Sequence, residues 1–221
     1  MMKISLVTLA RGAVFLWLLF WATTSFAQAD ASGVDWRPGA LSAPTAPPAT
    51  DAPLSTGAWV AHGTLTLVPL GGLYAASRLG NERAWAAGAQ TGAGMAAAWV
   101  PSGLLFFRAQ SAGPRWAEWE VSLFGLGMVA TPTLAGLGTW TMGEWAFHGS
   151  QHRERALLGA LGGATVGTLL GVATYEVLER LAAPGSRMNA WRRGIALGFV
   201  GSGATAGYQW AGGGPRDRIR R

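Results

Sequence analysis

From residue 52 onward the chain alternates between long uncharged runs and short charged clusters. The uncharged runs cover residues 52–77, 84–107, 121–143, 156–175 and 194–215. Charged clusters separate them, for example RLGNER at 78–83 and HGSQHRER at 148–155. As a helix, a run of about 20 apolar residues crosses the ~30 Å hydrocarbon layer of a membrane, whereas a soluble helix carries charges along its wet face. The pattern predicts an all-α membrane domain over residues 57–213, with about five transmembrane helices.

One of these runs carries glycine at every fourth position. The segment GALGGATVGTLLG, residues 159–171, places Gly159, Gly163, Gly167 and Gly171 on one stripe of the predicted helix. In water each glycine costs a helix interior about 1 kcal/mol relative to alanine. In lipid, helices associate through close van der Waals packing, and small residues four apart let two backbones approach. We therefore expect this stripe to be a helix-packing surface.

Looser stripes of small residues recur on three other runs. They consist of Ala84, Gly88, Gly92 and Ala96, of Gly127, Thr131, Ala135, Thr139 and Gly143, and of Gly194, Gly198, Ser202 and Ala206, with Gly203 and Gly207 beside the last. The same packing argument predicts helix contacts at Gly88, Gly92, Gly194 and Gly198. Residues 156–175 resemble the glycine-zipper membrane segments of bacterial envelope proteins. The resemblance implies a packing motif, which in some such proteins belongs to a pore and in others only to assembly.

The first 56 residues do not follow this pattern of long uncharged runs separated by charged clusters. Lys3 and Arg11, an apolar stretch at 12–22 and the sequence Ala27-Gln28-Ala29 form the pattern of a secretory signal peptide over residues 1–29. An uncleaved membrane anchor is the alternative. Residues 30–56 are rich in proline and alanine and predict a disordered linker. Residues 214–221 form a basic tail.

Composition excludes several classes of protein. Charged residues make up 13% of the chain, about half the ~25% of soluble domains. The net charge is +6, but the basic residues form no stripe, so no nucleic-acid partner is expected. The chain has no cysteine, which excludes disulfides and thiol catalysis.

Few residues are candidates for chemistry. Glu144, His148 and His152 are spaced four apart, so on a continuous helix they would share a face able to bind a divalent metal. Gly149-Ser150 is expected to end the helix between the histidines, which favours a solvated loop, no metal and no cofactor. His62 is expected to be hydrogen-bonded inside the bundle. The nucleotide-loop, HExxH and GxSxG motifs are absent, so the protein is expected not to be an enzyme.

Arginine counts do not orient the predicted spans. With a translocated N-terminus and five spans, eight arginines lie on the cytoplasmic side and seven on the other. The cytoplasmic set is Arg78, Arg83, Arg153, Arg155, Arg216, Arg218, Arg220 and Arg221, and the other set is Arg37, Arg108, Arg115, Arg180, Arg187, Arg192 and Arg193. The positive-inside rule needs a clearer excess.

Together these patterns predict a non-enzymatic, multi-pass protein of the bacterial cell envelope with a structural or assembly role. The lipid bilayer is its expected partner, with a homo-oligomer as a further option, and the inner membrane is favoured over the outer. The alternatives are a small pore or channel, an outer-membrane β-barrel and a soluble glycine-rich bundle.

Overall fold

The computed structural model describes residues 55–106, 118–147, 149–181 and 186–216. These residues form five α-helices and one π-helical turn, namely α2 (Thr56–Leu79), α3 (Ala84–Leu105), α4 (Glu118–Thr141), η1 (Met142–Ala146), α5 (Arg153–Leu181) and α6 (Ser186–Gly212). The prediction of an all-helical domain with five helices is confirmed. The described residues contain no β-strand, only one isolated bridge, so the β-barrel alternative is wrong for this part of the chain.

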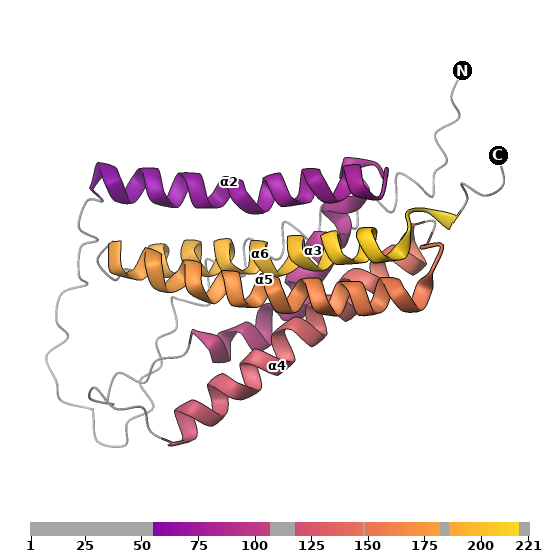
Figure 1. The fold of residues 1–221 in the computed structure, drawn as a ribbon. Coiled ribbons are helices and arrows are strands. Elements are labelled where there is room, and N and C mark those ends of the chain that lie inside the picture. The colour runs from indigo at the N-terminus through magenta and orange to yellow at the C-terminus, as the bar shows by residue number, and fades with distance from the viewer. Residues whose placement is uncertain (1–54, 107–117, 148, 182–185, 217–221) are drawn as a thin grey trace, which may run out of the picture.

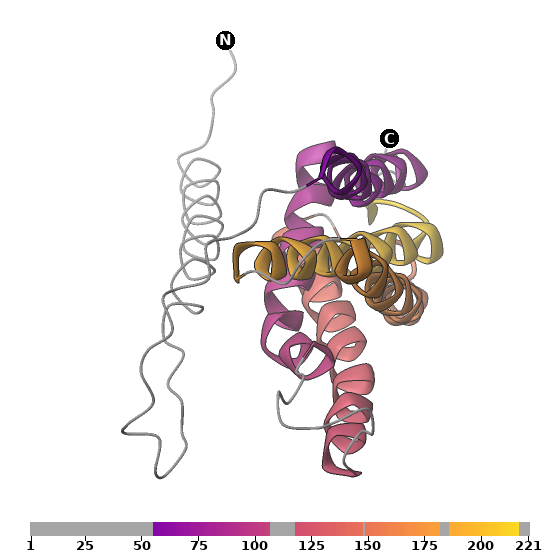
Figure 2. The ribbon, with the colours of Figure 1, turned by 90° about the vertical axis from the view of Figure 1, so that its left-hand side faces the viewer.

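The helices form two layers. Helices α2, α6 and α5 run side by side with α6 in the middle, while α3 and α4 form an antiparallel pair inclined to them (Figures 1 and 2). Helix α6 contacts all four other helices, and its contact with α5 is the most extensive. Residues 80–83 join α2 to α3, and α4 continues through η1 toward α5, so one end of the molecule gathers the ends of α2, α4 and α6 with the starts of α3 and α5.

Capping and proline positions explain local details of α2. The Ser55 hydroxyl accepts a hydrogen bond from the Ala58 N–H at 3.2 Å, which satisfies one free donor of the first turn. Pro69 lies inside the helix and is buried. Its ring fills the space beside Gly198, where an added Cβ would lie 3.1 Å from the proline. Gly198 therefore leaves room for the Pro69 ring to pack against α6.

Two helices extend beyond the uncharged runs. Helix α5 begins at Arg153 and ends at Leu181, and α6 begins at Ser186, eight residues before its uncharged run. The charged residues that separate the last two uncharged runs therefore belong in part to helices, since residues 179–181 end α5 and residues 186–193 begin α6. Arg192, one of them, is hydrogen-bonded inside the bundle. A buried charge is tolerated when its donors are satisfied.

The interior and the surface are built from different side chains. Of the eighteen buried hydrophobic residues in the described part, twelve are alanine. Large apolar side chains point outward instead, and twenty-two of them are exposed. On α5 they include Leu158, Val166 and Leu169. The helices thus pack through small residues and turn their bulky apolar residues away from one another.

Two helical segments are long and apolar enough to cross a membrane, Val121–Ala146 and Arg153–Leu181. The other helices of the described residues do not reach the mean hydropathy that this requires; α3, for example, consists largely of alanine and glycine and has few larger apolar residues. The predicted signal peptide at 1–29 lies outside the described residues, as do most of the linker and residues 217–221 of the tail.

Candidate functional site

Three chain segments meet at one end of the bundle. The chain after α6 pairs with the connection between η1 and α5, because the Gln151 N–H donates to the Gly214 carbonyl at 3.1 Å and the Arg216 N–H donates to the Gly149 carbonyl at 3.0 Å. Gly214 has a φ of +84°. A Cβ on it would lie 2.8 Å from the carbonyl oxygen of Gly80 in the turn between α2 and α3. The C-terminal segment is therefore held against two other connections.

The Glu144 carboxylate lies at the centre of this junction, in the π-helical turn. Its side chain is 3% exposed. Its Oε1 accepts hydrogen bonds from the Ser150 N–H at 2.9 Å and the Ser150 hydroxyl at 2.5 Å. The same oxygen accepts one from the Tyr208 hydroxyl at 3.2 Å. Its Oε2 pairs with the Arg216 Nη2 at 3.0 Å. Four charge-assisted contacts thus join η1, the next connection, α6 and the C-terminal segment.

A second polar network lies next to Glu144, between α3 and α6. The Gln209 Nε2 donates to the Gln90 Oε1 at 2.9 Å and also to the Glu82 Oε2. The Gln90 Nε2 donates to the same Glu82 oxygen at 3.2 Å. Gly80 has no side chain where the Gln209 amide lies. Both glutamines are buried, and their side-chain amides have hydrogen-bond partners inside the protein.

Threonines extend this network toward the middle of the bundle. The Thr139 hydroxyl donates to the Gln90 carbonyl at 3.2 Å. The hydroxyls of Thr91 and Thr205 lie 2.8 Å apart and link α3 to α6. These polar groups have hydrogen-bond partners within the chain. At this end of the bundle they therefore form contacts that hold α3, α4 and α6 together.

The opposite end holds a buried histidine–arginine pair. The His62 Nδ1 lies 2.7 Å from the Ala58 carbonyl, which only accepts, so that nitrogen carries the proton. The Nε2 then accepts from the Nε of Arg192 at 3.4 Å. The Arg192 side chain is fully buried. His62 therefore has the hydrogen-bonded position expected for it inside the bundle.

Arg193, the next residue, is held against α3. Its guanidinium carbon lies 4.0 Å from the centre of the Trp99 ring, a cation–π arrangement. Its Nη2 donates to the Trp99 carbonyl at 2.5 Å and to the Ser102 hydroxyl at 3.2 Å. Two adjacent arginines at this end are thus directed into contacts between helices.

The glycine stripe of α5 faces the backbone of α6. An added Cβ on Gly159, Gly163 or Gly167 would overlap the carbonyl oxygen of Gly207, Gly203 or Phe199, respectively. On Gly171 it would lie 2.6 Å from the Ala196 carbonyl oxygen. Any side chain on these four glycines would force the two helices apart.

The other predicted packing glycines lie differently. Added Cβ atoms on Gly88 and Gly194 would meet nothing within 4 Å, and Gly92 lies on the same partly exposed side of α3 as Gly88. Gly198 contacts Pro69. Close approaches occur instead at Gly94, Gly138 and Gly201, which face α4, α3 and α3, respectively. Helix α3 carries small residues on every side, so spacing alone did not identify its contact face.

The three metal candidates are not brought together by the described residues. Glu144 is engaged by Ser150, Tyr208 and Arg216. His152 is exposed at the start of α5, and His148 lies outside the described residues. The described part holds no group of three or more potential metal ligands.

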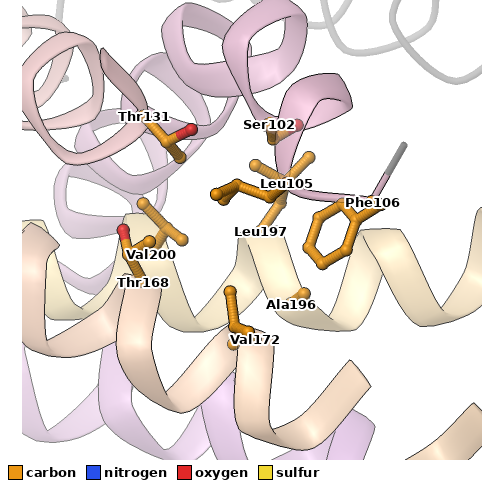
Figure 3. A pocket seen from close by; sticks show the side chains of 10 residues that line it. Ser102, Leu105, Phe106, Thr131, Thr168, Val172, Ala196, Leu197 and Val200 are labelled. Carbon is orange, nitrogen blue, oxygen red and sulfur yellow. The ribbon is translucent and has the colours of Figure 1, made fainter. Parts of the chain in front are cut away.

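A small apolar pocket lies between the two helix layers (Figure 3). It is too narrow to hold a water molecule and is lined in part by Leu105, Thr168 and Val200. The fully buried Thr131 also lines it (Figure 3), and the Thr131 hydroxyl has no hydrogen-bond partner among the described residues.

Sequence reasoning missed the residues that complete the polar end. Tyr208, Gln209 and Gln90 lie inside uncharged runs, and Arg216 was assigned only to a basic tail. The available signal was the presence of two glutamines in otherwise apolar runs, because a buried amide requires partners.

Comparisons with models of protein families, with curated proteins and with solved structures found no match to this chain.

Proposed function

We propose that the chain is a non-enzymatic, multi-pass α-helical membrane protein of a bacterial cell envelope, with a structural or assembly role. The observation that carries the proposal is the inverted placement of side chains. Alanine, glycine and hydrogen-bonded polar groups fill the interior, while twenty-two large apolar side chains of the described residues are exposed.

Hydrocarbon surroundings suit this surface better than water does. Moving a valine- or leucine-sized side chain out of water gains about 1.5–3 kcal/mol, and soluble monomers expose only small contiguous apolar patches. Exposed tryptophans near helix ends match the aromatic belts of membrane proteins. They are Trp59 in α2, Trp85 in α3, Trp145 in η1 and Trp210 in α6.

A lipid environment also accounts for the interior. Helices in lipid gain no hydrophobic drive from meeting, so close backbone contact must hold them together. The α5–α6 glycine contact supplies such an approach. Polar groups in a membrane need internal partners, which Gln90 and Gln209 have. We infer that all five helices lie within the membrane and that the bundle serves as a rigid packing unit.

Membrane fractionation of the full chain tests the proposal. Expressed in a bacterium, the protein should sediment with the inner membrane, resist alkaline carbonate and require detergent for extraction. Recovery in the aqueous supernatant overturns it and favours the soluble bundle. Purified protein in dye-loaded vesicles tests the role, since dye retention supports a sealed structural bundle and leakage favours the pore.

A further inference from the structure

We propose that the end of the bundle around Glu144 binds anionic phospholipid headgroups and therefore faces the cytoplasmic leaflet. We call it the arginine-rich end, defined by the exposed side chains of Arg78, Arg83, Arg153, Arg155 and Arg216. The inference rests on the proposed membrane location and adds to it an orientation and a lipid class.

The five arginines come from segments that the polar end brings together. Arg78 lies in the last turn of α2, and Arg83 directly precedes α3. Arg153 and Arg155 lie in the first turn of α5, and Arg216 follows α6. Within the described residues the guanidinium groups of Arg83 and Arg155 make no hydrogen bond or ion pair. They are therefore free to contact a phosphate.

Few acidic groups offset these charges at the surface. Glu144 pairs with Arg216 at 3.0 Å and lies 3.9 Å from Arg153, but its side chain is 3% exposed and presents little carboxylate to the surface. Glu82 is partly buried and accepts hydrogen bonds from Gln90 and Gln209. Glu154 is the exposed carboxylate among the described residues of this end. Lipid phosphates approaching the end thus meet mostly guanidinium groups.

The opposite end has arginines of a different kind. Arg192 is fully buried beside His62, and Arg193 is stacked on Trp99. Among the described residues of that end, Arg180 has an exposed arginine side chain. Counting arginines by segment gave eight against seven, but an arginine directed into the bundle does not reach a headgroup. Among the arginines whose side chains the structure describes, five are exposed at the arginine-rich end and one, Arg180, is exposed at the opposite end.

Aromatic side chains place the arginine-rich end at the depth of the headgroups. Trp85, Trp145 and Trp210 belong to this end and are 59%, 76% and 78% exposed. Tryptophan concentrates at the membrane–water interface. Arginines beside it lie within reach of lipid phosphates, where each contributes about 1 kcal/mol of attraction to an anionic membrane.

Spin-labelled lipids test the lipid class. The protein is reconstituted in phosphatidylcholine vesicles, and motional restriction of labelled phosphatidylglycerol and phosphatidylcholine is compared by electron paramagnetic resonance. We expect preferential restriction of phosphatidylglycerol. The double variant Arg83→Gln/Arg155→Gln should lower that preference by roughly 25-fold, since about 1 kcal/mol per residue corresponds to roughly fivefold for each of the two, whereas the control Arg180→Gln should not. Equal restriction of both lipids, or an equal loss in the control, overturns the inference.

The same experiment separates this inference from the proposed function. If neither lipid is restricted, the membrane location itself is wrong. If both are restricted equally, the membrane location stands and the headgroup preference fails.

Orientation is tested by cysteine labelling, which the cysteine-free chain permits directly. His152→Cys reports on the arginine-rich end and Thr56→Cys on the opposite end, both at exposed positions. In intact cells an impermeant maleimide should label the Thr56→Cys variant and reach the His152→Cys variant only after lysis. The reverse result overturns the orientation, and detergent-solubilised protein shows that both thiols are reactive.

Discussion

Gly163 of α5 and Gly203 of α6 face each other so closely that a Cβ on either would overlap the carbonyl oxygen of the other. Gly159 and Gly207 repeat the relationship one turn away. Reciprocal contact of two glycine pairs brings the helix backbones together without intervening side chains. This geometry makes the α5–α6 contact the part of the fold most sensitive to added volume.

Replacing Gly163 with leucine should therefore separate α5 from α6. Overpacking a well-filled interior usually costs about 1–3 kcal/mol, and here the clash is with backbone, which cannot rotate away, so we expect the upper part of that range or more. The measurement is the thermal unfolding of the purified protein in detergent, followed by circular dichroism.

Gly162→Leu is the matched control. Gly162 is the preceding residue of the same helix, and an added Cβ there meets nothing within 4 Å. This variant should unfold at or above the wild-type temperature, because leucine favours helix over glycine. Equal destabilisation by both substitutions would show that the tight α5–α6 contact is absent.

Glu144→Gln should weaken the junction at the arginine-rich end. The amide keeps the size of the carboxylate but loses the charge that Arg216 and Ser150 contact. Hydrogen bonds to a charged group contribute about 1.5–3 kcal/mol, so we expect a loss in that range. Trypsin cleavage after Arg216 reports the local effect and should become faster.

Glu154→Gln serves as its control, because Glu154 is exposed in the first turn of α5. It should change stability by a few tenths of a kcal/mol, the size of a screened interaction with the helix dipole, and leave the trypsin cleavage rate unchanged. A similar acceleration in both variants would contradict the central role of Glu144.

The five helices follow from the sequence more readily than the faces through which they contact one another. Five helices follow from the five uncharged runs, although the charged residues at 153–155 and 186–193 also belong to helices. The strict glycine repeat on α5 identified a single face, because only that face is free of bulky side chains. On α3 the predicted stripe through Gly88 is partly exposed, while Gly94 makes the close contact with α4.

The candidate site was harder to predict because its members are far apart in sequence. Glu144 was singled out for its spacing to two histidines, yet its partners are Ser150, Tyr208 and Arg216. Spacing along one helix reports only neighbours on that helix. The pairing of η1 with α6 depends on how the helices pack, which local sequence does not specify.

His62→Phe should destabilise the opposite end. The aromatic ring keeps the volume beside Trp191, whose ring centre lies 5.1 Å from that of His62. It removes the acceptor of the Arg192 Nε inside the bundle. Losing one partner of a buried donor costs about 1–3 kcal/mol, measurable as a lower unfolding temperature. His152→Phe, at an exposed position, should leave that temperature unchanged, and equal shifts would argue against the buried pair.

Thr131→Val should stabilise the protein, unlike most substitutions of buried residues. The Thr131 hydroxyl is fully buried beside the apolar pocket and has no hydrogen-bond partner among the described residues. Valine has nearly the same shape, so the change removes an unsatisfied polar group without opening a cavity. Burying such a hydroxyl costs about 1–3 kcal/mol, and we expect the unfolding free energy to rise by about 1 kcal/mol.

Thr205→Val gives the opposite expectation and serves as the comparison. Its hydroxyl lies 2.8 Å from that of Thr91 and donates to the Gly201 carbonyl at 3.0 Å. The valine variant should lose about 1 kcal/mol, the net contribution of a buried hydrogen bond. Unfolding of both variants in the same detergent gives the sign of each effect. If Thr131→Val proves as destabilising as Thr205→Val, the Thr131 hydroxyl has a partner in solution and the pocket is hydrated.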